Sequence, residues 1–251
     1  MLEPTVADSY VRVLQEELLL ATGCTEPIAI AYAAALLRQT LGAMPERIRA
    51  DVSGNIIKNV KSVIVPNTGG LKGIQAAISA GVAAGRADQG LQVIAHIHEG
   101  AREEISDYLA STPIEVACAP TPWQLDIQLT AWAGEHTALV RIVETHNNVV
   151  RVERDGQVLV DKAPAAPGAD TSDARSFMSV AGILEFAETV DLSLVSPLLD
   201  RQISCNEAIA KEGLEGSWGA NVGSVILSDY PQDIKNEAQA WAAAGSDARM
   251  S

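Results

Sequence analysis

The spacing of apolar side chains changes along the chain and separates helix-forming from strand-forming regions. Over residues 5–21 they recur every three or four positions, with Tyr10 and Leu14 on one stripe. This period predicts an amphipathic helix that stops at Gly23. A second helix is predicted over residues 28–40, because Pro27 suits a first helical turn and alanines occupy several faces of the segment, so we expect it to be buried.

The next part of the chain mixes short segments of both kinds. Residues 47–53 alternate apolar and charged side chains, which predicts a half-buried strand. Residues 61–65 form a short β-branched segment, and a glycine-rich turn over residues 66–70 follows it. Helices are predicted over residues 71–84 and 91–110.

Residues 114–160 change to the period of strands. Three alternating segments cover residues 125–129, 138–143 and 149–153. Turn residues at 146–148 and 155–156 separate consecutive strands, so the region predicts an antiparallel meander.

The last part of the chain returns to the helical period. Residues 162–173 are rich in Pro, Ala and Gly and predict a surface connection. Helices are predicted over residues 176–189, 194–211 and 233–244. The glycines between the last two do not match a dinucleotide-binding motif, because no strand leads into them, and we interpret them as close backbone packing: Gly213, Gly216, Gly219 and Gly223.

These elements predict an α+β fold with an alanine-rich helical lobe packed against an antiparallel β-meander lobe. The predicted division is an N-terminal α/β lobe over residues 1–112, a β lobe over residues 113–162 and a helical segment over residues 163–251. At 251 residues the chain is long enough for a full core.

Charge and hydropathy exclude two classes of partner. A net charge of −14 disfavours binding to nucleic acid, which relies on a positive surface. No apolar run reaches the roughly 18 to 20 residues of a membrane helix, and no signal-peptide pattern opens the chain. We therefore expect a cytoplasmic protein that does not act at a membrane.

The three cysteines are widely separated and lack CxxC spacing, which argues against a disulfide framework and against a zinc site within the chain. We interpret Cys118 and Cys205 as small buried hydrophobes. Cys24 differs, because it lies at a junction between two predicted helices.

The run Gly23-Cys24-Thr25-Glu26-Pro27 places a thiol, a hydroxyl and a carboxylate side by side. A thiol at a helix start tends to be acidified, which suits a catalytic or metal-binding role for Cys24. Glu26 has two interpretations, a functional carboxylate or ordinary electrostatic stabilisation of a first helical turn.

Polar residues gather in a second region, between two apolar segments. The amides and the lysine are candidate ligands for a substrate carboxylate or amine, although a polar strand end with its lysine in solvent is the simpler interpretation: Asn55, Lys58 and Asn59. The turn ahead of the next helix offers backbone amides as an anion-binding site: Asn67, Thr68 and Gly69. His146, in a hairpin turn, is a candidate base or a plain surface residue.

Dispersed motifs in one order resemble the L-cysteine desulfidase family, which is related to the iron-sulfur L-serine dehydratases. They are Gly23-Cys24-Thr25-Glu26-Pro27, Ser53-Gly54-Asn55, Lys58-Asn59, Pro66-Asn67-Thr68-Gly69, Glu144-Thr145-His146-Asn147, Glu212-Gly213-Leu214 and Trp218-Gly219. The resemblance covers nearly the whole chain. It implies a [4Fe-4S] lyase that converts L-cysteine to pyruvate, ammonia and sulfide, with Cys24 as cluster ligand or catalytic thiol and with Glu26 and His146 in the catalytic group.

The chain also departs from that family, whose members continue well beyond the Ser246-Asp247-Ala248-Arg249 motif. A cubane held by thiolates needs three or four cysteines, and only Cys24 matches the family pattern here. We therefore expect an N-terminal part that lacks the cluster by itself and that works with a missing C-terminal half or subunit, or as a homo-oligomer. Two alternatives remain: a non-catalytic module that binds a small carboxylate or amino acid, and one subunit of a two-chain L-serine dehydratase.

Overall fold

The structure is a computed structural model that describes residues 4–164 and 175–250. The chain forms two compact units. One comprises residues 20–167, and the other comprises residues 1–19 together with residues 168–251. The predicted α+β class is confirmed, because a six-stranded sheet and a set of helices both occur.

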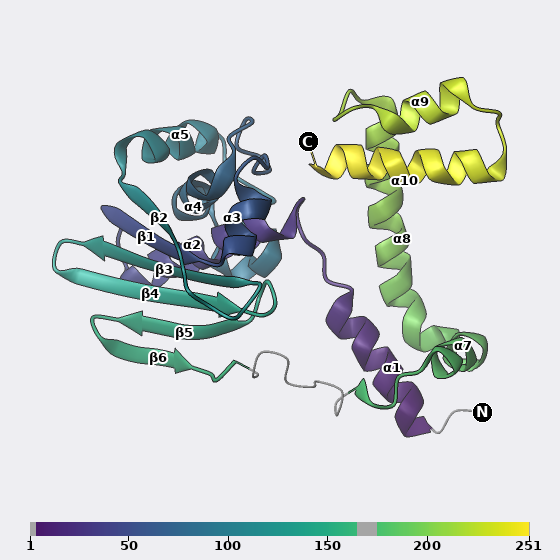
Figure 1. Cartoon of the computed structure of the whole chain (residues 1–251), viewed down its shortest axis with the longest axis horizontal. Coiled ribbons are helices and arrows are strands. Elements are labelled where there is room, and N and C mark those ends of the chain that lie inside the picture. The colour runs from purple at the N-terminus through teal and green to yellow at the C-terminus, as the bar shows by residue number, and fades with distance from the viewer. Residues whose placement is uncertain (1–3, 165–174, 251) are drawn as a thin grey trace. The chain divides into compact units, whose positions relative to one another are not determined.

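The unit of residues 20–167 is built on a mixed sheet with strand order β2-β1-β3-β4-β5-β6 (Figure 1). The strands are β1 (Arg47–Val52), β2 (Ile114–Cys118), β3 (Asp126–Ala133), β4 (His136–Val143), β5 (Val149–Arg154) and β6 (Gln157–Asp161). From β3 to β6 the neighbours are consecutive and antiparallel, which confirms the predicted meander. β1 joins this meander antiparallel to β3, and β2 pairs parallel to β1 at the edge.

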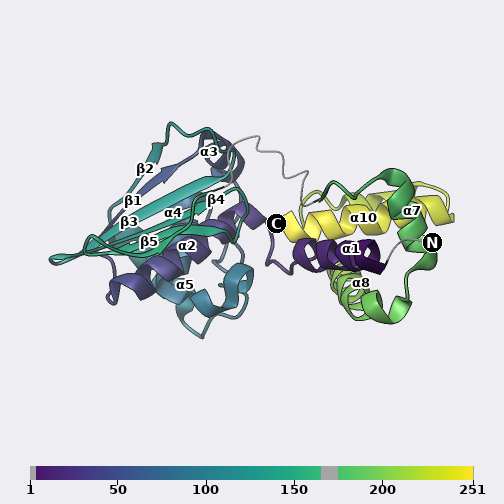
Figure 2. The same cartoon turned by 90° about the horizontal axis from the view of Figure 1, so that it is seen from below.

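Helix α2 (Thr25–Leu41) lies across β3 and β4 and is the centre of the core (Figure 2). Apolar side chains point from alternate strand positions toward it, among them Ile48, Leu129 and Val140, each fully buried. α4 (Gly73–Ala84) packs on α2, and α5 (Ala101–Ser111) packs on α4. The predicted burial of the second helix is therefore correct, and its all-round alanine content is the reason that it fits between a sheet and another helix.

Small residues let α2 and α4 approach closely. A Cβ at Gly81 would collide with the backbone carbonyl of Ala31. The guanidinium of Arg38 then crosses from α2 to the end of α4, where it donates to the carbonyl oxygens of Val82 at 2.5 Å and Gly85 at 3.0 Å. These bonds satisfy carbonyl groups that the end of a helix leaves unpaired.

The segment after β1 is a helix, not the polar strand end that its sequence predicts. α3 (Gly54–Val60) starts at Ser53, whose hydroxyl accepts from the amide of Ile56 at 3.3 Å and donates to the carbonyl of Gln124 at 2.6 Å. Ile56 and Val60, four residues apart, are buried on one side of the helix. A serine N-cap and this spacing outweigh the low helix propensity of the β-branched residues.

Two other boundaries differ from the predictions. α4 begins at Gly73, two residues later than predicted, because Ile64 and Lys72 form an antiparallel bridge that keeps the preceding turn extended. Of the predicted helix over residues 91–110, only residues 101–110 are α-helical, in α5, whereas residues 91 and 92 end a 3₁₀ helix, η1 (Ala87–Gln92), and residues 93–100 are not helical. Gly100 precedes α5 with a left-handed backbone, φ 86°, which glycine adopts without a steric penalty.

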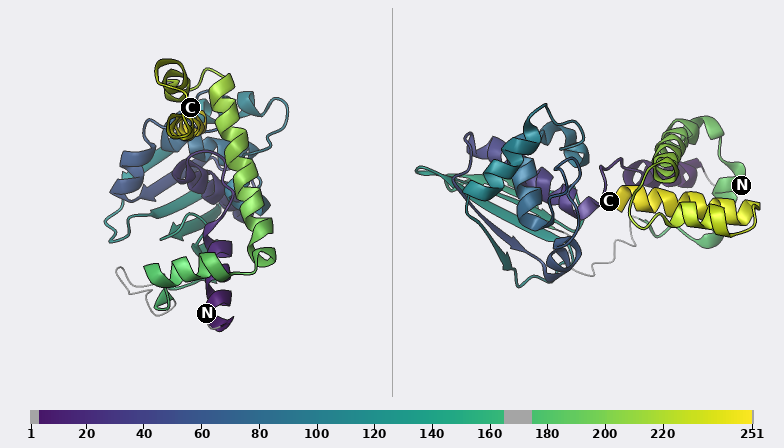
Figure 3. Two further views of the ribbon diagram at one scale, coloured as in Figure 1. Left: turned by 90° about the vertical axis from the view of Figure 1, so that its right-hand side faces the viewer. Right: turned by 90° about the horizontal axis from the view of Figure 1, so that it is seen from above.

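The second unit is helical (Figure 3). It contains α1 (Pro4–Glu17), α7 (Val180–Thr189), α8 (Leu192–Glu215), α9 (Val222–Asp229) and α10 (Ile234–Met250). α1 ends four residues before the predicted end. α9 was not predicted, and α8 and α10 run beyond their predicted ends. Tyr10 of α1 stacks on Phe186 of α7 with ring centroids 5.0 Å apart, which forms a small core with Val195.

Two glycines of the helical unit confirm the prediction of close backbone packing. A Cβ at Gly213 of α8 would collide with the carbonyl of Ala244 on α10, and a Cβ at Gly223 of α9 would lie 2.6 Å from the carbonyl of Ala240. Both glycines are buried. The predicted connection over residues 162–173 falls mostly outside the described residues.

The structure divides the chain differently from the three predicted segments. β1, from the predicted N-terminal lobe, is hydrogen-bonded to both β2 and β3, so the strands of the two predicted lobes form one sheet with one core. α1 belongs with the C-terminal helices. Such pairings join residues far apart in sequence, and local periodicity does not encode them. Within the described part of the chain, no helix combines the length and apolarity needed to cross a membrane.

We expect Gly81→Ala to lower the free energy of unfolding by more than about 2 kcal/mol, because the added methyl forces α2 and α4 apart. Chemical denaturation followed by circular dichroism measures the effect. Gly54→Ala is the matched control, since a Cβ there meets only the Cys118 sulfur at 3.7 Å. Equal stability of the two variants would contradict the tight contact.

Candidate functional site

The candidate site is built at the N-terminus of α2. Gly23 has a left-handed backbone, φ 73°, and turns the chain into an extended Cys24, which occupies the N-cap position of the helix. No hydrogen bond from a backbone amide caps onto the Cys24 side chain. The thiol is therefore directed to a side-chain partner instead of to the helix end.

That partner is Glu26, in the first turn of α2. The Cys24 thiol donates to Oε2 of Glu26, with a sulfur-to-oxygen distance of 3.2 Å. The Thr25 hydroxyl donates to the same oxygen at 3.5 Å. The three consecutive motif residues thus form one local network on a helix start, where the helix dipole also favours a negative charge.

Helix α3 supplies a third donor to this carboxylate. Nδ2 of Asn59 donates to Oε1 of Glu26 at 3.3 Å. Asn59 is half-buried near the end of α3, so the Ser53 cap that starts this helix also determines where Asn59 lies. The structure brings Asn59 to Glu26, a contact that the sequence did not predict.

His146 completes the group from the turn between β4 and β5. It is half-buried, and its Nε2 atom is buried without a hydrogen-bond partner. Its imidazole lies close enough to Glu26 for each group to affect the charge of the other. A buried ring nitrogen without a partner is costly unless a ligand or water satisfies it.

The environment lowers the pKa of both titratable groups. Burial alone would raise the pKa of Glu26, but hydrogen bonds from Cys24, from its own backbone and from Asn59, together with the charge of His146, outweigh it and lower this pKa. Burial lowers the pKa of His146, and the negative charge of Glu26 partly opposes that shift. At neutral pH the site therefore holds an ionised carboxylate beside a neutral imidazole.

The residues of the predicted anion-binding turn make hydrogen bonds of their own. The Asn67 side chain donates to the carbonyl of Ile94 at 2.8 Å, and the buried Thr68 hydroxyl donates to the carbonyl of Val65 at 2.7 Å, so both hold their loop together. Gly69 is exposed, with φ 75°. These residues precede a helix that starts only at Gly73, so their amides do not form its first turn.

Asn55 and Lys58 lie on α3 with Asn59 but do not join its contact. Asn55 is half-buried in the first turn of the helix, and Lys58 is exposed. Within residues 4–164 and 175–250, neither makes a hydrogen bond to Glu26. Thr25, which the sequence marks only as part of its motif, does donate a hydrogen bond to Glu26. The sequence does not show in which direction a side chain points, so it could not distinguish Thr25 from Asn55 and Lys58 in this respect.

The cysteines of this chain do not by themselves form a ligand set for a [4Fe-4S] cluster. Cys118, predicted to be buried, is exposed because it ends the edge strand β2. Cys205 is half-buried on α8 in the other unit. Among the described residues, no three His, Cys, Asp or Glu side chains are placed to hold a metal ion. A cubane needs three or four thiolates, so this chain offers Cys24 as one ligand at most.

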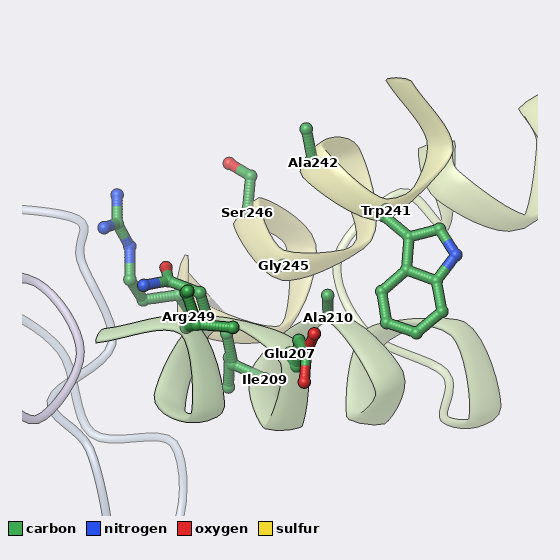
Figure 4. A pocket seen from close by; sticks show the side chains of 10 residues that line it. Glu207, Ile209, Ala210, Trp241, Ala242, Gly245, Ser246 and Arg249 are labelled. Atoms are coloured by element: carbon green, nitrogen blue, oxygen red, sulfur yellow. The ribbon is translucent and has the colours of Figure 1, made fainter. Parts of the chain in front are cut away.

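A cavity of about 430 Å³ lies in the helical unit, between α8 and α10 (Figure 4). Its lining includes Glu207 and Ala210 from α8 and Trp241, Gly245 and Arg249 from α10. None of the predicted site residues lines it. The reactive side chains and this cavity therefore belong to different units of the chain.

Comparison with known proteins finds relatives that carry a family name without an activity. The chain is 48% identical over 243 residues to a UPF0597 protein of Desulfitobacterium hafniense (strain Y51), a match of 97% of this chain and 56% of that protein. It is 45% identical to a UPF0597 protein of Lachnoclostridium phytofermentans, covering 95% of this chain and 57% of the relative. The chain thus spans a little over half the length of these relatives. No family model and no solved structure matches it.

We expect Glu26→Gln to lower the pKa of His146 further, because the glutamate charge is what raises it. Titration of the imidazole proton resonances by NMR measures the change. The His136 resonance, from the β3–β4 hairpin, serves as the internal reference. An unchanged titration of His146 in the variant would show that the two side chains do not interact.

His146 also predicts a pH dependence of stability. Its folded pKa lies below the ordinary value of 6.5, so below that pH the unfolded chain binds a proton that the folded chain excludes. Stability is therefore lost as the pH falls below 6.5, and His146→Gln should reduce this loss. Urea unfolding of both proteins between about pH 5 and 8 measures it, and parallel pH curves for the two would refute the prediction.

Proposed function

We propose that this chain provides the proton-handling part of a cytoplasmic lyase that eliminates hydrosulfide from L-cysteine or water from L-serine. The observation that carries the proposal is the convergence of Cys24, Glu26, Asn59 and His146 from two helices and a hairpin turn. These residues come from three separate motifs of the L-cysteine desulfidase resemblance. Motifs that serve only local packing have no reason to converge on one carboxylate.

The proposed reaction requires groups that accept and donate protons near the substrate. The Cα–H and Cβ–S bonds of L-cysteine break, hydrosulfide leaves, and the resulting 2-aminoacrylate is hydrolysed to pyruvate and ammonia. His146 is neutral at the working pH and has a buried nitrogen without a partner, so it suits the base that takes the Cα proton. Cys24 with Glu26 forms a thiol–carboxylate pair that can pass a proton toward the leaving sulfur.

The resemblance implies an iron-sulfur cluster, and we propose that this chain would supply only part of its ligands. The chain supplies Cys24 at most, so the further thiolates would come from a second subunit or from a region such as the one that the longer relatives carry. The alternative of a module that binds an anion has less support, because Asn67 and Thr68 bond to backbone carbonyls and Glu26 is negative.

The proposal is tested in a chimera in which this chain replaces the matching 56% of the Desulfitobacterium relative. Purified anaerobically and supplied with iron and sulfide, the chimera is expected to release sulfide and pyruvate from L-cysteine in equal amounts, whereas this chain alone releases neither. Because the thiol handles a proton or holds the metal, Cys24→Ala should lower the rate by at least about 100-fold.

Cys118→Ala in the same chimera is the matched control, since its exposed thiol lies at the end of an edge strand. Its rate should equal that of the parent. Pyruvate from L-serine without sulfide from L-cysteine would favour the dehydratase alternative. A folded chimera that binds these amino acids but turns over neither would favour the binding module and defeat the lyase.

A further inference from the structure

Glu26 has an unbalanced charge. Within the described parts of the chain, no lysine, arginine or histidine nitrogen lies within ion-pair distance of its carboxylate. All its hydrogen-bond donors are neutral groups, namely the Cys24 thiol, the Thr25 hydroxyl, the Asn59 amide and its own backbone. A half-buried anion held only by neutral donors keeps its full charge and attracts a cation.

Both oxygens of Glu26 have only weak or long hydrogen bonds. Oε1 receives the Asn59 amide at 3.3 Å. Oε2 receives the Thr25 hydroxyl at 3.5 Å, a long contact, and a thiol, which is a weak donor. Neither oxygen has a strong, charged donor, so the carboxylate as a whole gains from one.

We propose that Glu26 binds the α-ammonium group of the substrate, so that the site selects amines over plain carboxylic acids. This rests on the proposed function for the identity of the substrate, but it names which end of the amino acid this chain recognises. A protonated amine donates up to three hydrogen bonds. One reaches the carboxylate of Glu26, and the bond becomes charge-assisted and stronger than the contacts it joins.

In this proposal Asn59, Cys24 and Glu26 each have a different role in binding the substrate. Asn59 is a positioning residue, because its amide holds Oε1 of Glu26 in place. An ammonium bound at Oε2 lies next to the Cys24 sulfur, which donates to the same oxygen. The substrate carboxylate is then directed away from Glu26 by charge repulsion.

Three thiols that differ in one group each test the proposal on the full chain. L-cysteine carries both ammonium and carboxylate, cysteamine lacks the carboxylate, and 3-mercaptopropanoate lacks the ammonium. Anaerobic calorimetry at about pH 8, where the imidazole of His146 is neutral, is expected to show binding of L-cysteine and cysteamine. Affinity for 3-mercaptopropanoate should be about 10- to 100-fold weaker, the range for loss of one charge-assisted bond.

Glu26→Gln keeps the shape and removes the charge, so it should weaken cysteamine binding by the same factor. Glu103→Gln, an exposed glutamate in the first turn of α5, is the matched control and should bind like the parent chain. The Asn59 side-chain amide resonance, followed by NMR, should shift on addition of cysteamine.

Three results would overturn the proposal: stronger binding of 3-mercaptopropanoate than of cysteamine, unchanged affinity in Glu26→Gln, or no binding of cysteamine by the folded chain. These outcomes are separate from those of the lyase assay. Amine binding without sulfide release keeps the ammonium site and rejects the lyase. Sulfide release by a chimera that carries Glu26→Gln, with an unchanged KM, keeps the lyase and rejects the ammonium site.

Discussion

The close contact between α2 and α4 is the constraint on which the sheet unit depends. The absence of a side chain at Gly81 lets the two helices meet at the backbone of Ala31, and the alanines of α2 let its other faces lie on the sheet. A helix packed between a sheet and another helix has little freedom to rotate or slide. Cys24 and Glu26 extend from the first turn of this helix, so their position follows from the packing of the core.

The second half of the site depends on a different device. Ser53 ends β1, caps α3 and bonds to Gln124 before the meander begins. Asn59 reaches Glu26 because α3 starts at that serine and runs for two turns. The Ser53 hydroxyl thus links the end of β1, the start of α3 and, through α3, the contact between Asn59 and Glu26. The geometry around Glu26 is therefore set by the packing of regular elements.

The sequence was informative where period and turn chemistry act locally. The meander, the buried second helix and the packing role of Gly213 and Gly223 could all be predicted from such patterns. The parallel partner of β1 could not, because β2 lies more than sixty residues away along the chain. α3 was missed because its β-branched residues resemble a strand, although the Ser53 cap was a readable signal.

The segment between α1 and α2 is anchored to the sheet unit just before the thiol. α1 belongs to the helical unit, and the chain enters the sheet unit at Leu20, four residues ahead of Cys24. The Thr22 amide donates to the carbonyl oxygen of Leu91 at 3.3 Å and so anchors the backbone two residues before Cys24. This bond holds residue 22 to the 3₁₀ helix η1 of the sheet unit, so the backbone that carries the thiol is set by the same unit that carries Glu26, Asn59 and His146.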